Sequence, residues 1–344
     1  MVVADEKCNG CRLCVSECPV GSYAAAADSA CMTGSQAHCV GCGLCWQQCP
    51  AAAIEYEDDT ERFIRDVSSG LPVALLVAPA ATRCFADYRQ VFGYLQSLGV
   101  RSFHNVLLRA DITIWAYVKL LRNDRAAYLS SPCAAVTAYI RRYKPGLQPY
   151  LMPVYSPLAC TVIYLQKYRH LTDRLAFLSP CVAKRREIRA LQPPGYNITI
   201  SRLQQYLATH RIDLSGYQAV DFDDRPEGAG LTLGVYGGVS ESIAAHLPAR
   251  QFVKVAGPDK VYRWLDEYER IARADGPLPH LAELYNCRAG CEGGTGISAG
   301  QKTGLAPVDR QRSGQVRPAP GNQRRAAQLF TTFNRTLCLP DFMT

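Results

Sequence analysis

The sequence lacks the segments that would carry the chain into or across a membrane. No run of about 18 apolar residues occurs, which excludes a transmembrane helix. The first residues, MVVADEKC, do not form an apolar secretory signal. No strand leads into a GxGxxG turn and no GxxxxGK(S/T) motif is present, so neither a nicotinamide cofactor nor ATP is indicated. We therefore expect a cytoplasmic protein without a membrane span.

Positive charge is also not evenly distributed along the sequence. The net charge is +8, but residues 301–325 carry six basic residues against one acidic residue, which accounts for five of these charges. This stretch is rich in Gly and Pro and poorly periodic, so it predicts a solvated, mobile loop; the alternative is a docking patch for an acidic electron-transfer partner. Charge confined to such a stretch argues against binding to nucleic acid. The charged residues are Lys302, Arg310, Arg312, Arg317, Arg324, Arg325 and Asp309.

Cysteine, in contrast, is abundant, with 16 residues in a chain of 344. Reducing conditions in the cytoplasm disfavour disulfides, so these thiols are expected to be metal ligands or reactive groups.

Eight of the cysteines form two copies of the spacing C-x2-C-x2-C-x3-C-P within the first sixty residues. In bacterial ferredoxins with this spacing, three cysteines of each copy bind one 4Fe–4S cubane and the fourth binds the other cubane. Zinc sites also use CxxC pairs but do not need eight cysteines in two such copies. Two clusters of this kind carry single electrons and do no chemistry on a substrate. The predicted ligands are Cys8, Cys11, Cys14 and Cys49 for the first cluster and Cys39, Cys42, Cys45 and Cys18 for the second, while Cys31 is expected not to be a ligand.

The remaining chain alternates between strand-like and helix-like segments with short connections. PVALLVAP and RLAFLSPC indicate buried strands, and DITIWAYVKLLRN indicates a helix with Asp111 as its cap. This alternation predicts an α/β domain with largely parallel strands. The expected organisation is an α+β two-cluster domain at 1–60, a linker at 61–72 and an α/β domain at 73–344.

Two of the remaining cysteines follow strand-like segments that end in Ser-Pro. Cys133 and Cys181 stand where a strand gives way to a helix, which is the edge of a parallel sheet at which sites form. A helix N-terminus stabilises a thiolate at this position. Cys287 and Cys291 lie in the glycine-rich segment YNCRAGCEGGTG, where glycines let the backbone approach a bulky group. Together these cysteines predict a third iron–sulfur site, and the alternative is four ordinary buried thiols.

The motifs SSPCAAV, LSPCVAK and NCRAGCEGGTG resemble the three cysteine motifs of the iron–iron (FeFe) hydrogenases, and the likeness covers nearly the whole chain. It implies an α/β catalytic domain with an H-cluster, a 4Fe–4S cubane joined to a diiron unit that carries CO, cyanide and a dithiolate. Cys133, Cys181 and Cys287 would hold the cubane, and Cys291 would bridge to the diiron unit. Lys184 would donate to an iron-bound cyanide. The implied partners are H2, protons, a low-potential electron carrier such as ferredoxin, and maturation enzymes.

The chain also departs from that family. Pro132 stands where the best-known active enzymes have a proton-shuttling cysteine, Ser179 replaces a methionine, and GTG replaces three glycines. This pattern is similar to divergent groups of the family, some of which are regarded as hydrogen sensors. Ser156 matches a serine of the family's proton path. Cys160 is interpreted as a core thiol, and the alternative is that it replaces the missing cysteine. Glu187 is interpreted as a surface acid.

Three functions follow from these observations. The first is a slow hydrogenase that couples H2 oxidation or proton reduction to electron transfer through the two ferredoxin-type clusters. The second is an H2 or redox sensor that a separate partner reads. The third is a Nar1-like iron–sulfur assembly scaffold without a diiron unit, which the presence of Lys184 disfavours.

Overall fold

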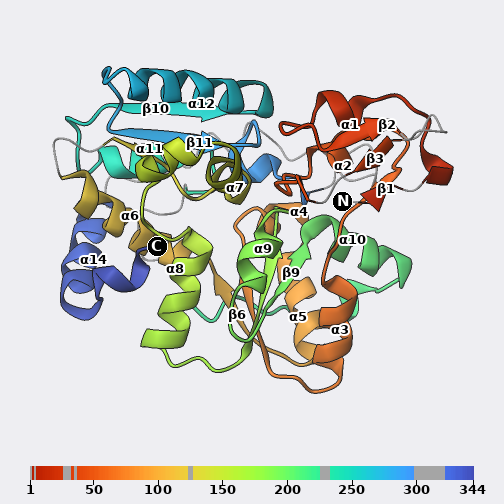
Figure 1. The fold of residues 1–344 in the computed structure, drawn as a ribbon. Helices are drawn as coiled ribbons and strands as arrows, with labels where there is room; N and C mark the ends of the chain where they lie inside the picture. The colour runs from red at the N-terminus through yellow and green to blue at the C-terminus, as the bar shows by residue number, and fades with distance from the viewer. Residues whose placement is uncertain are drawn as a thin grey trace.

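A computed structural model describes residues 2–3, 5–25, 32–34, 37–122, 127–224, 233–297 and 322–344. Cys31 and most of the basic stretch 301–325 lie outside these described residues. Figure 1 shows three regions: the N-terminal segment with α1 and α2, a sheet containing β6 and β9, and a sheet containing β10 and β11.

The N-terminal segment consists of short elements around the two cysteine runs. β1 (Val2–Val3) pairs with β4 (Ile54–Glu55), and β2 (Tyr23–Ala25) pairs with β3 (Met32–Gly34), both antiparallel. Each run contains a short helix, α1 (Leu13–Ser16) or α2 (Leu44–Gln48). This α+β arrangement is the one expected for the N-terminal region.

The larger sheet has the order β6-β5-β8-β9, and all its strands are parallel. The central strand β5 has the sequence VALLV and is buried at every position, as expected for a parallel strand covered on both faces. The strands are β5 (Val73–Val77), β6 (Val100–Asn105), β8 (Arg174–Ser179) and β9 (Tyr196–Thr199).

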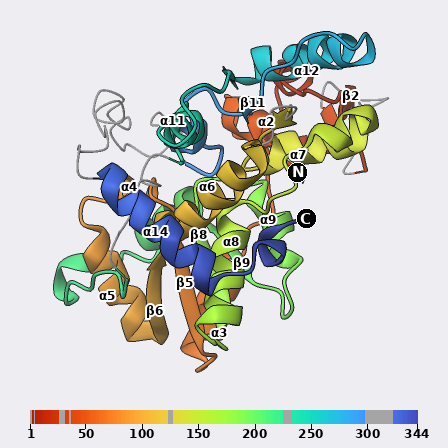
Figure 2. The ribbon, with the colours of Figure 1, turned by 90° about the vertical axis from the view of Figure 1, so that its left-hand side faces the viewer.

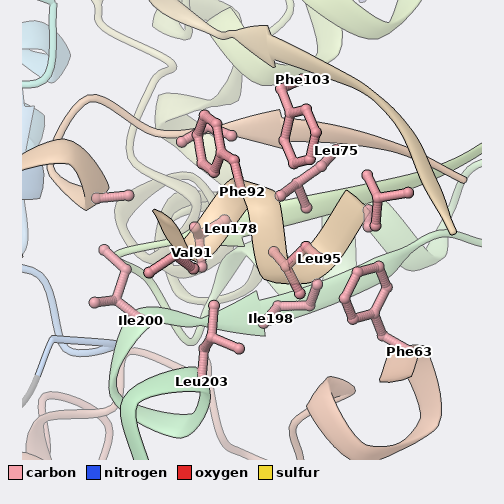
Figure 3. Close-up of a cluster of buried hydrophobic side chains, with 14 of the residues drawn as sticks. Phe63, Leu75, Val91, Phe92, Leu95, Phe103, Leu178, Ile198, Ile200 and Leu203 are labelled. Atoms are coloured by element: carbon pink, nitrogen blue, oxygen red, sulfur yellow. The ribbon is translucent and has the colours of Figure 1, made fainter. Parts of the chain in front are cut away.

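Helices α3, α5 and α10 contribute to an apolar core on one face of this sheet. Phe92 of α5 stacks on Phe103 of β6 with ring centroids 4.5 Å apart, and Phe63 of α3 is fully buried nearby. Figure 3 shows these side chains pointing toward Leu75 and Ile198 of the sheet. The helices are α3 (Thr60–Ser68), α5 (Tyr88–Leu98) and α10 (Ile200–Thr209).

The smaller sheet has the order β10-β11-β7 and is also parallel. Figure 1 shows α12 above this sheet, and Figure 2 shows α14 running beside α6. The two parallel sheets confirm the predicted α/β class. The strands are β7 (Tyr128–Leu129), β10 (Phe252–Ala256) and β11 (Leu281–Tyr285), and the remaining helices are α4 (Ala81–Cys84), α6 (Leu107–Leu121), α7 (Ala134–Tyr143), α8 (Pro157–Ile163), α9 (Lys184–Arg189), α11 (Gly238–Ala244), α12 (Pro258–Arg273) and α14 (Asn322–Thr336).

Residues 61–72, expected to be a linker, contain most of α3. The apolar side chains Phe63, Ile64 and Val67 of this helix are buried in the core of the larger sheet. The segment is therefore an integral part of the packing, because one face of the helix is apolar.

The connection just before α3 is fixed by Asp59. Its side chain is 2% exposed, accepts from the backbone nitrogen of Asn197 at 3.0 Å, and lies 2.9 Å from the guanidinium of Arg189. Arg62 and Arg185 also pair with this carboxylate, at 3.3 and 3.5 Å. Asp59 thus ties the end of the N-terminal segment to β9 and α9.

Among the helices that the structure describes, none has the length and apolar character needed to cross a membrane.

Candidate functional site

The four cysteines of the α/β region lie at the carboxyl ends of three strands. Cys133 follows β7 and is the N-cap residue of α7, and Cys181 follows β8. Cys287 and Cys291 follow β11, which pairs directly with β7. Asn286 connects two of these segments, because its backbone nitrogen donates to the Cys133 sulfur at 3.4 Å. The topology of the smaller sheet therefore brings Cys133 close to Cys287 and Cys291, whereas Cys181 comes from the end of a strand in the larger sheet.

The electrostatics of these thiols agree with their proximity. Burial and, after it, the neighbouring Cys133 together raise the pKa of Cys181 to about 11. Burial raises the pKa of Cys291 to about 12, with added contributions from Cys181 and Cys133. The pKa of Cys287 is raised well above its ordinary value by burial and by the other three thiols. Each of these four residues nevertheless keeps some accessible surface.

The glycines of the third motif let it lie against the second motif. A Cβ on Gly294 would come within 2.1 Å of the Pro180 carbonyl oxygen, and one on Gly296 would come within 2.8 Å of the Cys181 nitrogen. The Gly296 nitrogen donates to that same Pro180 oxygen at 2.7 Å. The sequence predicted that these glycines make room for a bulky group. The structure shows that Gly294 and Gly296 make room for the backbone that presents Cys181.

The donor set fits an iron–sulfur cluster. Thiolates are the soft ligands that such clusters require, and four thiols from three segments converge here with a backbone N–H directed at one sulfur. Within the described ranges, no three His, Cys, Asp or Glu side chains are grouped so as to hold a single metal ion.

Lys184 is the first residue of α9 and lies beside this thiol cluster. Its side chain is buried, donates to the Ser156 hydroxyl at 2.9 Å and forms an ion pair with Glu187. Burial opposes its charge, but Glu187, Cys181 and Cys291 outweigh that effect, so the pKa of Lys184 is raised. A charged donor is therefore held within the electrostatic reach of both cysteines.

Glu187 is not the simple surface acid that the sequence suggested. Its carboxylate accepts from Lys184 and from the Ser156 hydroxyl, and Ser156 is also the N-cap of α8. Glu187 stands three residues after Lys184, on the same face of α9. The spacing of three residues could have indicated the pairing of Glu187 with Lys184. The contact of Ser156 with both side chains is made only in the tertiary fold, so the sequence did not indicate it.

Cys160 is buried within the electrostatic reach of Lys184 and Glu187, and Pro132 is also a buried residue. The Cys160 side chain is fully buried within an apolar cluster, and burial raises its pKa to about 12. Its sulfur donates to the Tyr155 carbonyl at 3.4 Å. These contacts are those of a core thiol, which was one of the two readings of the sequence.

A partly buried ion pair that the sequence did not reveal lies next to Cys291. Glu292 is 6% exposed and pairs with Arg83 of α4, whose pKa is lowered by burial. Glu292 is adjacent to Cys291, whereas Arg83 is distant in sequence, so no local pattern could have identified the pair.

In the N-terminal segment, one hollow is lined by the four cysteines predicted to bind the first cluster. These are Cys8, Cys11, Cys14 and Cys49. Backbone nitrogens donate to three cysteine sulfurs of the segment: Ser22 to Cys18 and Gly41 to Cys39, both at 3.2 Å, and Ala53 to Cys49 at 3.3 Å. Such N–H···S contacts are favourable to a cluster-bound thiolate.

The second cysteine run is joined to the thiol cluster by Thr295. Its hydroxyl donates to the Cys42 carbonyl at 2.8 Å, and a Cβ on Gly43 would approach Thr295 within 2.6 Å. Arg186 of α9 also donates to the Cys39 carbonyl. The GTG sequence thus places a hydroxyl at the contact between the two regions.

Comparison with known families and structures gives the following matches. The sequence model of the family described as iron only hydrogenase large subunit, C-terminal domain, matches residues 72–295. The model of the 4Fe-4S binding domain matches residues 1–23 and 35–55. No curated protein matches the sequence.

Several solved structures share the fold. One is an FeFe hydrogenase studied for oxygen inactivation through the 2Fe subcluster of its H cluster, with a TM-score of 0.63 and 15% identity over 82% of this chain and 95% of that chain. A variant of the FeFe hydrogenase HydA1 from Chlamydomonas reinhardtii gives a TM-score of 0.60 and 17% identity over 83% and 98%. HydA(deltaEFG), a structure described as revealing stepwise H-cluster assembly, gives 0.58 and 15% over 83% and 98%. At these identities the similarity establishes the fold.

Proposed function

This chain belongs to the iron-only hydrogenase large-subunit family, and from that premise we propose that it slowly interconverts H2 with protons and electrons. The electrons would pass through two ferredoxin-type 4Fe–4S clusters in residues 1–60, and the reaction would take place in residues 73–344. The observation that supports this proposal is the convergence of four cysteines from three strand ends with a buried lysine. The test is H2 evolution from a reduced low-potential dye after co-expression with hydrogenase maturation enzymes, and absence of activity would contradict it.

The residues that would hold the H-cluster are those given by the resemblance. Cys133, Cys181 and Cys287 would bind the cubane, and Cys291 would bind both halves. When bound, the H-cluster supplies the iron site at which H2 is formed or split. The chain supplies the thiolates, and the packing of the third motif on Pro180 holds Cys181 and Cys291 in a fixed relation.

Lys184 would hold the diiron unit in orientation by donating a hydrogen bond to a cyanide ligand. We expect Lys184→Met to reduce H2 evolution about ten- to a hundredfold, because a charged hydrogen bond contributes about 1.5–3 kcal/mol. Ser156 and Glu187 contact the ammonium group of Lys184, and they would keep it protonated and oriented toward the cyanide ligand. The measurement is the dye-linked rate normalised to bound iron.

Lys167→Met is the matched control, because Lys167 is an exposed lysine that pairs with Asp341. Its rate should equal that of the wild type. Unchanged activity in the Lys184 variant would contradict the assigned role.

Electrons would enter at the first cluster and leave through the second. Cys11 is exposed, and the apolar side chains of Leu13 and Val15 beside it are also exposed, which suits docking of a low-potential carrier such as ferredoxin. The second cluster's Cys42 contacts Thr295 near the catalytic thiols. The proposed partners are therefore H2, protons, such a carrier and the maturation enzymes, in the cytoplasm, where thiols stay reduced.

The proposed slowness rests on Pro132. Proline has no side-chain proton, whereas general acid–base steps contribute about 10² to 10⁴ in rate. We expect Pro132→Cys to raise the rate of H2 evolution by up to about that factor. The comparison is between the wild type, Pro132→Cys and Cys160→Ala, and the last should change nothing if Cys160 is a core thiol. If the wild type evolved H2 as fast as ordinary members of the family, the proposal of slow turnover would be contradicted.

Pro132 also favours a second candidate function, an H2 or redox sensor read by a separate partner. A site that binds H2 but lacks an efficient proton relay suits sensing better than bulk turnover. The two candidates differ in rate, since a sensor needs an H2-dependent change in the cluster without appreciable turnover.

A further inference from the structure

A tyrosine side chain donates to a predicted cluster ligand in the N-terminal segment. The Tyr23 hydroxyl lies 3.0 Å from the Cys45 sulfur, and the Tyr23 side chain is buried. Cys45 is predicted to bind the second cluster together with Cys18, Cys39 and Cys42. The contact therefore concerns the cluster that is in contact with the catalytic region through Thr295.

This hydroxyl differs in kind from the neighbouring donors. Ser22, Gly41 and Ala53 donate to cysteine sulfurs through backbone nitrogens, which other residues in the same backbone could also supply. The Tyr23 donor depends on the side chain, so this sequence has a hydrogen bond that phenylalanine at the same position would not make.

The surrounding structure fixes the ring in place. Tyr23 of β2 pairs with Gly34 of β3, and a Cβ on Gly34 would approach the Tyr23 ring within 2.9 Å. The ring also belongs to a buried apolar cluster with Cys49, Ala53 and Ile54. The absence of a side chain at position 34 therefore leaves room for the ring in the orientation that directs its hydroxyl at Cys45.

We propose that the Tyr23 hydroxyl raises the reduction potential of the cluster bound by Cys18, Cys39, Cys42 and Cys45. Reduction adds negative charge to the cluster and its sulfurs, so a donor to one sulfur stabilises the reduced form more than the oxidised form. The electron is then held preferentially on the cluster next to the catalytic region. This inference rests on the proposed function, because it requires both ferredoxin-type clusters.

The test is a redox titration of the reconstituted full chain, followed by electron paramagnetic resonance. In Tyr23→Phe, one of the two ferredoxin-cluster midpoints should move to lower potential, with the equilibrium constant for reduction falling about tenfold, or 59 mV for a one-electron couple. The other midpoint should stay unchanged. Unshifted midpoints in a variant with full iron content would overturn the inference.

Tyr56→Phe is the matched control. Tyr56 is also buried and lies against Trp46, but its hydroxyl bonds to Thr199 and Ser201 and not to a cysteine. This variant should leave both midpoints unchanged, and a shift equal to that of Tyr23→Phe would overturn the inference in favour of a general packing effect.

Two further measurements apply even if Tyr23→Phe does not fold. Gly34→Ala keeps the hydroxyl but displaces the ring, so the same midpoint should fall. Pulsed resonance spectra of the reduced wild type should show a strongly coupled proton in H2O that is replaced by deuterium in D2O, and absence of this exchangeable coupling would overturn the inference. A wild type that binds no ferredoxin-type clusters at all would instead refute the proposed function.

Discussion

Replacing Cys291 with alanine is expected to abolish H2 evolution while leaving the two ferredoxin-type clusters intact. Cys291 is the one thiolate proposed to join the cubane to the diiron unit. Its position is set by the backbone, since its nitrogen donates to the Gly234 carbonyl at 2.8 Å, and it lies within the electrostatic reach of Cys181 and Cys133. The readouts are the rate of H2 evolution and the resonance signals of the reduced ferredoxin clusters.

Cys338→Ala provides the control for this variant. Cys338 is an exposed cysteine outside every cysteine motif, so its loss should change neither readout. Retention of full activity by the Cys291 variant would show that the bridge is assigned to the wrong residue.

A large loss of stability is expected for Asp59→Ala. This buried carboxylate is in contact with three guanidinium groups, on Arg62, Arg185 and Arg189, and with the Asn197 backbone. Removing it leaves partly buried positive charges without their partner, which costs about 3–5 kcal/mol of the free energy of unfolding. The measurement is urea denaturation followed by circular dichroism, with both proteins at equal iron content.

Glu57→Ala tests whether burial is the cause. Glu57 also pairs with Arg185, but its side chain is 65% exposed, so its loss should cost only about 0–1 kcal/mol. Equal effects for the two substitutions would contradict the importance of the buried network.

Much of the fold could be predicted because local sequence determines it. The run VALLV forms β5 as expected. The Asp111 prediction is wrong, because α6 begins at Leu107, whose nitrogen donates to the Asn105 side chain at 2.9 Å. The helix α3 could have been recognised, since Phe63, Ile64 and Val67 share one helical face.

The candidate site likewise has features that the sequence predicts and contacts that it does not. Cysteine spacing and the Ser-Pro-Cys elements predict which thiols form one site, and the four thiols of the α/β region lie within electrostatic reach of one another. Contacts between distant segments could not be predicted, as shown by Ser156 with Glu187, Arg83 with Glu292, and Thr295 with the second cysteine run. Such contacts depend on how two separate sheets are arranged, and no local pattern encodes that arrangement.

Infrared spectroscopy of the anaerobically purified chain, co-expressed with maturation enzymes, tests the central claim most directly. A hydrogenase-type site predicts absorption bands from CO and cyanide bound to iron, and the same bands should be missing from the Cys291→Ala variant. A wild-type chain that has its iron–sulfur clusters but shows no such bands would contradict the account and would favour a scaffold without a diiron unit.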